Sequence, residues 1–128
     1  MEQKPILVVD DDPDAVEIVG TFLESRGYRV ASAPDGRQAL AKVDELRPAL
    51  VLLDVMMPGM DGWEVCRIIK NHPDYGDTRV VMLTARGEFA DKQEGLRCGA
   101  DDYIVKPIRL DELGQKVERN LEARRRAQ

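Results

Sequence analysis

Short apolar segments alternate with longer amphipathic segments five times along this chain. The clearest apolar segment is Leu50 to Leu53, four apolar residues without polar alternation, which is typical of a strand covered on both faces. Repeated strand–helix units predict a parallel sheet with helices on both of its faces. Because crossover connections between parallel strands are right-handed, we expect a single α/β domain with a doubly wound sheet of five strands and five helices.

Apolar spacing, together with the residues that begin and end helices, predicts where these elements lie. The expected strands are residues 6–9, 28–33, 49–53, 79–83 and 103–105. The expected helices are residues 13–26, 35–47, 64–71, 89–98 and 110–121. The second strand is the least apolar and should lie near an edge, and Gly95 interrupts the thin apolar face of the fourth helix. We expect the domain to cover residues 1–121, with a basic tail or the start of a linker at 122–128.

Composition narrows the class of protein. The chain has 128 residues, 43% of them hydrophobic, which is enough for one buried core. Its net charge of −5 argues against direct nucleic-acid binding by this domain. No apolar run reaches the roughly 18 residues that span a membrane, and no signal-peptide pattern is present, so we expect a cytoplasmic protein. Cys66 and Cys98 lack metal-site spacing and are expected to be small buried residues. The three arginines at 124–126 are expected to form a solvated helix end.

Charged or polar residues follow four of the five expected strands. In chain order they are Asp10, Asp11, Asp54, Thr84 and Lys106. In an open parallel sheet these strand ends share one edge, and ligands bind in the crevice beyond it. We therefore expect the five side chains to converge there, and we expect no comparable group at the opposite edge.

Taken singly, these residues also have ordinary structural explanations. The acidic run before Pro13 is typical of a helix cap, and Lys106 could be a surface lysine. Together they make a different pattern, because crowded carboxylates repel one another unless a cation lies among them. Carboxylate oxygens without nearby His or Cys favour Mg²⁺, with Mn²⁺ as a second choice.

A carboxylate nucleophile, a divalent cation and a lysine are the components of phosphoryl transfer to an aspartate. The product of that transfer is an acyl phosphate. The chain has neither a G-x-x-x-x-G-K-[ST] motif nor a G-x-G-x-x-G motif after its first strand. ATP is therefore not expected to be the direct phosphoryl donor.

Four motifs in this order and spacing resemble the receiver domain of bacterial two-component response regulators. They are ILVVDDDP at 6–13, LLDVMMPGMDG at 52–62, VVMLTA at 80–85 and GADDYIVKP at 99–107. The resemblance covers residues 4 to 121. It implies a flavodoxin-like, CheY-like receiver fold.

The resemblance also implies a role for individual residues. Asp54 would accept the phosphoryl group, and Lys106 would contact that group. Asp11 would bind Mg²⁺ directly and Asp10 through water, with Asp54 itself and the backbone carbonyl of Met56 as further ligands. The donor would be a phosphohistidine of a sensor histidine kinase or phosphotransfer protein, with small phosphodonors as substitutes. The chain would be no enzyme beyond its own phosphorylation and dephosphorylation at Asp54.

A conformational switch is the next implication of the resemblance. Thr84 would turn toward the phosphoryl group, and Tyr103 would move into the vacated space. This movement would reshape the face formed by the last two expected helices and the strand between them. The peptide bond between Lys106 and Pro107 is expected to be cis.

Two further positions set the lifetime of the acyl phosphate in this family. They lie two residues after the phosphorylated aspartate and two after the switch threonine, and here they are Met56 and Arg86. A bulky apolar side chain and a long cation both hinder in-line attack by water. We therefore expect moderate to slow autodephosphorylation.

Three other kinds of protein share some of these features. A Mg²⁺-dependent phosphatase of the haloacid-dehalogenase type also uses a strand-end aspartate, but it needs a carboxylate where Met56 stands. A flavodoxin-like binding module would have a loop rich in Ser, Thr and Gly in place of Asp10 to Asp12. A degenerate receiver would lack site residues, and every expected one is present.

The output of the domain is less constrained by the sequence. The partner is expected to be an unknown output protein or a further domain. Opposite charges on the last two expected helices, such as Arg97 and Glu118, also allow a phosphorylation-dependent homodimer through the switch face. Exposed ion pairs contribute only about 0–1 kcal/mol each, so two separately solvated helices remain the simpler alternative.

Overall fold

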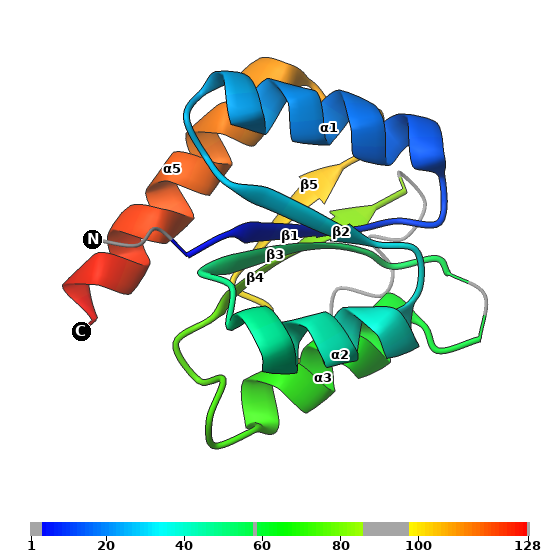
Figure 1. Cartoon of the computed structure of the whole chain (residues 1–128), viewed down its shortest axis with the longest axis vertical. Helices are drawn as coiled ribbons and strands as arrows, with labels where there is room; N and C mark the ends of the chain where they lie inside the picture. Colours follow the sequence, from blue (N-terminus) through cyan, green and yellow to red (C-terminus); the bar gives the residue numbers. More distant parts are fainter. Residues whose placement is uncertain (1–3, 58, 86–97, 128) are drawn as a thin grey trace.

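One sheet of five parallel strands lies in the described part of the computed structural model, residues 4–57, 59–85 and 98–127 (Figure 1). The strand order is β2-β1-β3-β4-β5. The strands are β1 (Ile6–Val9), β2 (Val30–Ala33), β3 (Leu50–Asp54), β4 (Arg79–Thr84) and β5 (Asp102–Val105). The weakly apolar second strand is thus at an edge, as predicted.

Four helices connect these strands within the same residues. They are α1 (Pro13–Ser25), α2 (Gly36–Leu46), α3 (Gly62–Asn71) and α5 (Leu110–Arg126). The helix predicted at 89–98 lies outside the described residues except for Cys98, so the labels pass from α3 to α5.

The helices cover the sheet in two layers, with α1 and α5 on one face and α2 and α3 on the other (Figure 1). Successive strand residues point to opposite faces. In β1, Ile6 and Val8 pack toward α1 and α5, whereas Leu7 and Val9 pack toward α2 and α3. The doubly wound α/β fold is confirmed.

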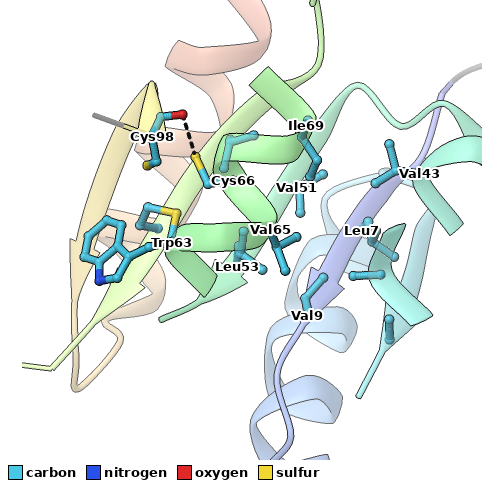
Figure 2. Close-up of a cluster of buried hydrophobic side chains, with 14 of the residues drawn as sticks. Leu7, Val9, Val43, Val51, Leu53, Trp63, Val65, Cys66, Ile69 and Cys98 are labelled. Atoms are coloured by element: carbon cyan, nitrogen blue, oxygen red, sulfur yellow. Dashed lines mark hydrogen bonds between the residues drawn. The ribbon is translucent and has the colours of Figure 1, made fainter. Parts of the chain in front are cut away.

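The core between the sheet and the α2–α3 layer holds residues that matter below. Figure 2 shows Val65 and Ile69 of α3 beside Val51 and Leu53 of β3, Cys66 beside Cys98, and Trp63 on the side of β5. Both cysteines are buried, as predicted. No helix in the described residues is long and apolar enough to cross a membrane.

Helix α5 runs past residue 121 and ends at Arg126. The prediction of three solvated arginines is wrong for one of them. The side chain of Arg124 is only 11% exposed, and its guanidinium lies 3.1 Å from a carboxylate oxygen of Asp77. Apolar spacing ends at Leu121, so no pattern in the sequence indicates that a charged residue packs beyond it.

A group of charged side chains also gathers at the opposite edge of the sheet, where none was expected. Asp101 accepts hydrogen bonds at 2.9 Å from Nζ of Lys70 on α3 and at 2.8 Å from the backbone N–H of Val80. Asp102, at the start of β5, binds Arg119 and accepts a hydrogen bond from Asn120 at 2.9 Å. We call these residues, with Lys116 and Arg79, the β5 network.

Candidate functional site

The carboxyl ends of four strands bring the predicted polar side chains to one edge. Asp54 is the last residue of β3 and Thr84 the last of β4. Asp10 directly follows β1, and Lys106 directly follows β5. Because β1, β3, β4 and β5 are neighbours in the sheet, these residues become neighbours in space.

Three carboxylates form the centre of this site. Asp10, Asp11 and Asp54 each offer an oxygen, and these oxygens all lie within 4.8 Å of one another. Asp10 is 3% exposed and Asp54 4%, whereas Asp11 is exposed. Two acids are therefore held largely out of water, and the third faces the solvent at the mouth of the site.

The helix cap does not account for this acidic run. The residue that caps α1 is Asp12, whose side chain accepts a hydrogen bond from the backbone N–H of Asp14 at 3.0 Å. Asp10 instead accepts a bond from the N–H of Asp12, also at 3.0 Å. Asp11 is left to face Asp54 across the site.

Lys106 is the cation that the described residues place against these acids. Its Nζ lies 3.1 Å from Oδ1 of Asp54 and 3.4 Å from Oδ2 of Asp10. The backbone N–H of Lys106 also donates to the carbonyl of Thr84 at 2.7 Å, which ties the loop to β4. The peptide bond from Lys106 to Pro107 is cis.

One ammonium group does not balance the buried acids. Burial and the charge of Asp10 raise the pKa of Asp54 above its ordinary value, although the hydrogen bond from Lys106 acts the other way. Burial would lower the pKa of Lys106, but the hydrogen bonds and charges of Asp54 and Asp10 together outweigh this effect and raise that pKa. The site therefore favours protonation at both groups, which is the electrostatic signature of surplus negative charge.

A divalent cation fits this donor set. Three close oxygens, the raised pKa of Asp54 and the exposed position of Asp11 suit a hard ion that keeps some of its water. In the described residues, no His or Cys lies in this group of acids, which disfavours a zinc-type site.

Met56 stands two residues after Asp54, at the mouth of the site. Its side chain is 68% exposed, and its backbone N–H donates to Oδ1 of Asp54 at 3.4 Å. No carboxylate stands at this position, as a haloacid-dehalogenase phosphatase would require. Arg86, the other residue predicted to control the acyl-phosphate lifetime, lies outside the described residues.

Gly62 is a site residue that sequence reasoning missed. A Cβ built on Gly62 would lie 2.2 Å from the carbonyl oxygen of Asp54 and 2.8 Å from Cα of Val55. Only a glycine lets the start of α3 approach the acceptor residue this closely. Gly62 is part of a quoted motif, but nothing in the sequence indicates which backbone it touches.

The two predicted switch residues lie on the neighbouring strands β4 and β5, where Thr84 pairs with Val105 and Tyr103 with Met82. Thr84 is 6% exposed. Tyr103 is half-buried, and its hydroxyl is buried without a hydrogen-bond partner in the described residues. Its ring centroid lies 6.4 Å from that of Trp63, the only tryptophan of the chain. This aromatic contact was not expected from the sequence.

Comparison with known proteins places this arrangement in a family. The family model for the response regulator receiver domain matches residues 6–118. The chain belongs to the response regulator receiver family. The DNA-binding response regulator MtrA of Mycolicibacterium smegmatis is 48% identical over 116 residues, which cover 91% of this chain and 50% of that protein. The chain thus spans about half the length of the curated relatives it matches.

Solved structures agree with this family assignment. A CheY-like receiver domain from Methanospirillum hungatei has a TM-score of 0.91 at 30% identity, covering 99% of this chain and 100% of that one. Chemotaxis protein CheY4 of Vibrio cholerae has a TM-score of 0.86 at 35% identity, covering 92% and 98%. The chain is therefore a receiver of two-component signalling.

Proposed function

We propose that this receiver accepts a phosphoryl group on Asp54 from the phosphohistidine of a sensor histidine kinase or phosphotransfer protein. The observation that carries the proposal is the environment of Asp54: a buried carboxylate of raised pKa, crowded by Asp10 and Asp11 and contacted by Lys106. A purely structural acid would have enough hydrogen-bond donors and cations around it to stabilise its negative charge. Asp54 is held in a state that gains from added positive charge.

Each residue has a defined part in the proposed transfer. An oxygen of Asp54 attacks phosphorus, the bond from phosphorus to the histidine nitrogen breaks, and the electron pair stays with the imidazole. Lys106 moves from pairing two carboxylates to pairing the incoming phosphoryl oxygens. Bound at Asp10, Asp11, Asp54 and the Met56 carbonyl, Mg²⁺ or Mn²⁺ would neutralise charge on the phosphoryl group.

Lys106 can be tested by removing its charge. Loss of one group that stabilises transition-state charge typically slows a reaction by about 10²–10³-fold. Lys106→Met should therefore slow phosphorylation of Asp54 by about that factor, while Arg109→Met, three residues on and exposed, should leave it unchanged. An equal rate for Lys106→Met and the original chain would contradict the assigned role.

Phosphorylation would be read out through Thr84 and Tyr103. Phosphorylation adds negative charge and acceptor oxygens at Asp54, and the Thr84 hydroxyl is the neighbouring donor on β4. The buried, unpartnered hydroxyl of Tyr103 leaves this ring without a polar anchor, so a small change of packing can move it. Trp63 lies against Tyr103, so its fluorescence should change on phosphorylation.

A kinase must dock on the surface of the domain, and one exposed apolar surface lies on α1 and the start of α5. Ile18 on α1 is 58% exposed and Leu110 at the start of α5 is 37% exposed, and both line one shallow pocket. We propose this surface as the docking face for the protein donor. Ile18→Ser should slow phosphotransfer from a sensor kinase that phosphorylates the original chain, yet leave phosphorylation by acetyl phosphate unchanged.

The control for the docking face is Ile68, on α3, which is 38% exposed on the other face of the sheet. Ile68→Ser should leave both reactions unchanged. If Ile18→Ser and Ile68→Ser behave alike with the kinase, the docking face is misplaced.

The lifetime of the acyl phosphate is proposed to depend on Met56. Its exposed side chain stands at the mouth of the site, where attacking water must enter. Met56→Asn should speed phosphate release from Asp54, followed as loss of phosphorylated mass with time. An unchanged or lower rate would contradict the proposal.

The output of the receiver is proposed to act through β5 and α5. Asp102 at this face is bound within the chain by Lys116 and Arg119. Ion pairs between two copies would have to exchange with these internal pairs. Light scattering with and without beryllofluoride tests for a homodimer, and a persistent monomer would leave a separate output partner or domain as the target.

The central test of the proposed function uses acetyl phosphate and Mg²⁺. Intact mass should rise by one phosphoryl group in the original chain and should not rise in Asp54→Asn. Omission of Mg²⁺ should also abolish the gain. Equal phosphorylation of Asp54→Asn would place the acceptor elsewhere and overturn the proposal.

A further inference from the structure

Two buried cysteines, far apart in sequence, meet beside the switch residue Tyr103. Cys66 lies in the middle of α3, and Cys98 lies shortly before the first residue of β5, Asp102. Sγ of Cys66 lies 3.5 Å from the carbonyl oxygen of Cys98, the contact drawn as a dashed line in Figure 2. Neither thiol has a place in the phosphoryl-transfer site at the carboxyl end of the sheet.

The backbone around Cys98 is packed directly against α3. A Cβ built on Gly99 would lie only 3.3 Å from Cβ of Lys70, which is one helical turn after Cys66 on the same side of α3. Close backbone approach is the main geometric requirement for a disulfide, because its Cα atoms must lie within about 4.4–6.8 Å. Rotation about the two Cα–Cβ bonds is then the movement that joins the sulfurs.

The two thiols differ in a way that suits this chemistry. The neighbouring Cys66 thiol holds the pKa of Cys98 below its ordinary value. The neighbouring Cys98, with burial, raises the pKa of Cys66. The thiolate is the reactive form of cysteine, so Cys98 would be the attacking group and Cys66 the resolving one.

We propose that Cys66 and Cys98 are a redox site, which hydrogen peroxide converts to an intramolecular disulfide. The Cys98 thiolate attacks the peroxide, the O–O bond breaks, and the released hydroxide takes a proton to form water. Cys98 is then a sulfenic acid. The Cys66 sulfur, losing its proton, attacks the Cys98 sulfur, the S–O bond breaks, and a second water leaves. Two thiols are oxidised by two electrons, and one peroxide is reduced to two waters.

A small peroxide would reach the two cysteines from the side of Cys98. Cys98 is buried, but the next residue, Gly99, is exposed. Opening of this short stretch therefore brings a small peroxide to the sulfur without unfolding the sheet. Disulfides in the reducing cytosol are usually transient and redox-sensing, which suits a pair of this kind.

The disulfide would act on the switch, not on the phosphoryl site. Cys66, Cys98, Trp63 and Tyr103 belong to one packed cluster. A covalent link between α3 and the residues before β5 would fix two sides of the space around Tyr103. Oxidation would therefore restrict the switch while leaving Asp54 able to accept a phosphoryl group.

Peptide mapping tests the proposal on the native original chain. Hydrogen peroxide should remove two hydrogen atoms from the intact mass, abolish alkylation of both cysteines together, and be reversed by a thiol reductant. Trypsin cuts after Arg67 and Arg97, so the linked fragments carrying Cys66 and Cys98 are directly identified. Two cysteines still open to alkylation, a link between chains, or sulfinic acid without a link would each overturn it.

Single variants assign the two roles. Cys66→Ser should stop at a Cys98 sulfenic acid that dimedone traps. Cys98→Ser should leave Cys66 reduced. Dimedone labelling of Cys66 in Cys98→Ser would reverse the assigned roles and contradict the mechanism. Circular dichroism shows whether each variant folds, and the peptide map of the original chain decides the disulfide itself even where a variant does not.

Discussion

The two edges of the sheet both hold partly buried acids, but they treat those acids in opposite ways. At the β5 network, burial would raise the pKa of Asp102, yet hydrogen bonds from Arg119, Asn120 and the backbone outweigh it and lower that pKa. At the other edge, burial and Asp10 raise the pKa of Asp54 despite Lys106. The β5 network stabilises the negative charge of Asp102 with donors from the chain itself, whereas the phosphoryl site leaves the negative charge around Asp54 only partly balanced.

This difference separates a structural group of charges from a ligand site. Each acid of the β5 network has several donors, which join α3, β4 and α5 to the start of β5. At the phosphoryl site one lysine pairs with Asp10 and Asp54, and a third acid, Asp11, lies beside them. The distribution of donors, more than burial or the number of charges, indicates where a cation and a phosphoryl group belong.

The largest effect is expected when the β5 network loses an acid. Asp101→Ala leaves the buried N–H of Val80 without its acceptor and removes the carboxylate partner of Lys70 and Arg79, which keep only neutral acceptors on Thr78 and Asn120. We expect a loss of about 2–3 kcal/mol in the free energy of unfolding, because partly buried cations and a backbone donor lose their partner. Urea denaturation measures this loss, and a change under about 0.5 kcal/mol, usual for an ordinary surface site, would break the comparison.

Gly62→Ala is expected to be next in size and to act on the other edge. Its new methyl group would overlap the carbonyl of Asp54, a backbone atom that cannot turn aside. Overpacking typically costs about 1–3 kcal/mol, and here it also displaces the acceptor loop. Urea denaturation and Mg²⁺ titration should both show a loss.

Gly114 is the matched control for that substitution. A Cβ at Gly114 on α5 would lie 3.2 Å from the guanidinium of Arg26, the flexible end of a side chain. Gly114→Ala should therefore be close to neutral, or stabilising by up to about 1 kcal/mol through helix propensity. Unchanged Mg²⁺ affinity in Gly62→Ala would show that Gly62 does not position the site.

The smallest effect is a difference of sign between two Asp→Asn changes. Because the pKa of Asp54 is raised in the folded chain, protonated Asp54 stabilises the folded state at pH values below its ordinary pKa of 3.8. This stabilisation is lost as the pH rises through the raised pKa. Asp54→Asn should thus melt above the original chain at neutral pH without divalent ions. Below the ordinary value the difference should vanish.

Asp102→Asn should do the reverse. The lowered pKa of Asp102 means that its contribution to stability is present at neutral pH and is lost as the pH falls through the lowered value. This variant should melt below the original chain at neutral pH, with a smaller difference in acid. Thermal unfolding at several pH values measures both variants, and shifts of the same sign would contradict the contrast between the edges.

The fold and the position of the site were predictable because both follow from chain periodicity. Five apolar segments with helices between them fix a parallel sheet, and the carboxyl ends of its strands share an edge. Asp54 and Lys106 could therefore be placed together, although 52 residues separate them. The capping role of Asp12 was equally local, since Pro13 follows it.

Contacts made at a distance could not be predicted in the same way. The β5 network depends on side chains from α3, β4 and α5, whose registers no periodic pattern specifies. The close approach of Gly62 to Asp54 and the meeting of Cys66 with Cys98 depend on how α3 sits on the sheet. Burial of Arg124 beside Asp77 depends in turn on where α5 ends.

Calorimetric titration of Mg²⁺ tests the central claim most directly, because it asks whether surplus charge at one edge binds a cation. The original chain should bind one ion. Asp11→Asn should weaken that binding strongly, and Asp102→Asn, which alters the opposite edge, should leave it unchanged. Absence of binding, or equal weakening by Asp11→Asn and Asp102→Asn, would contradict the account.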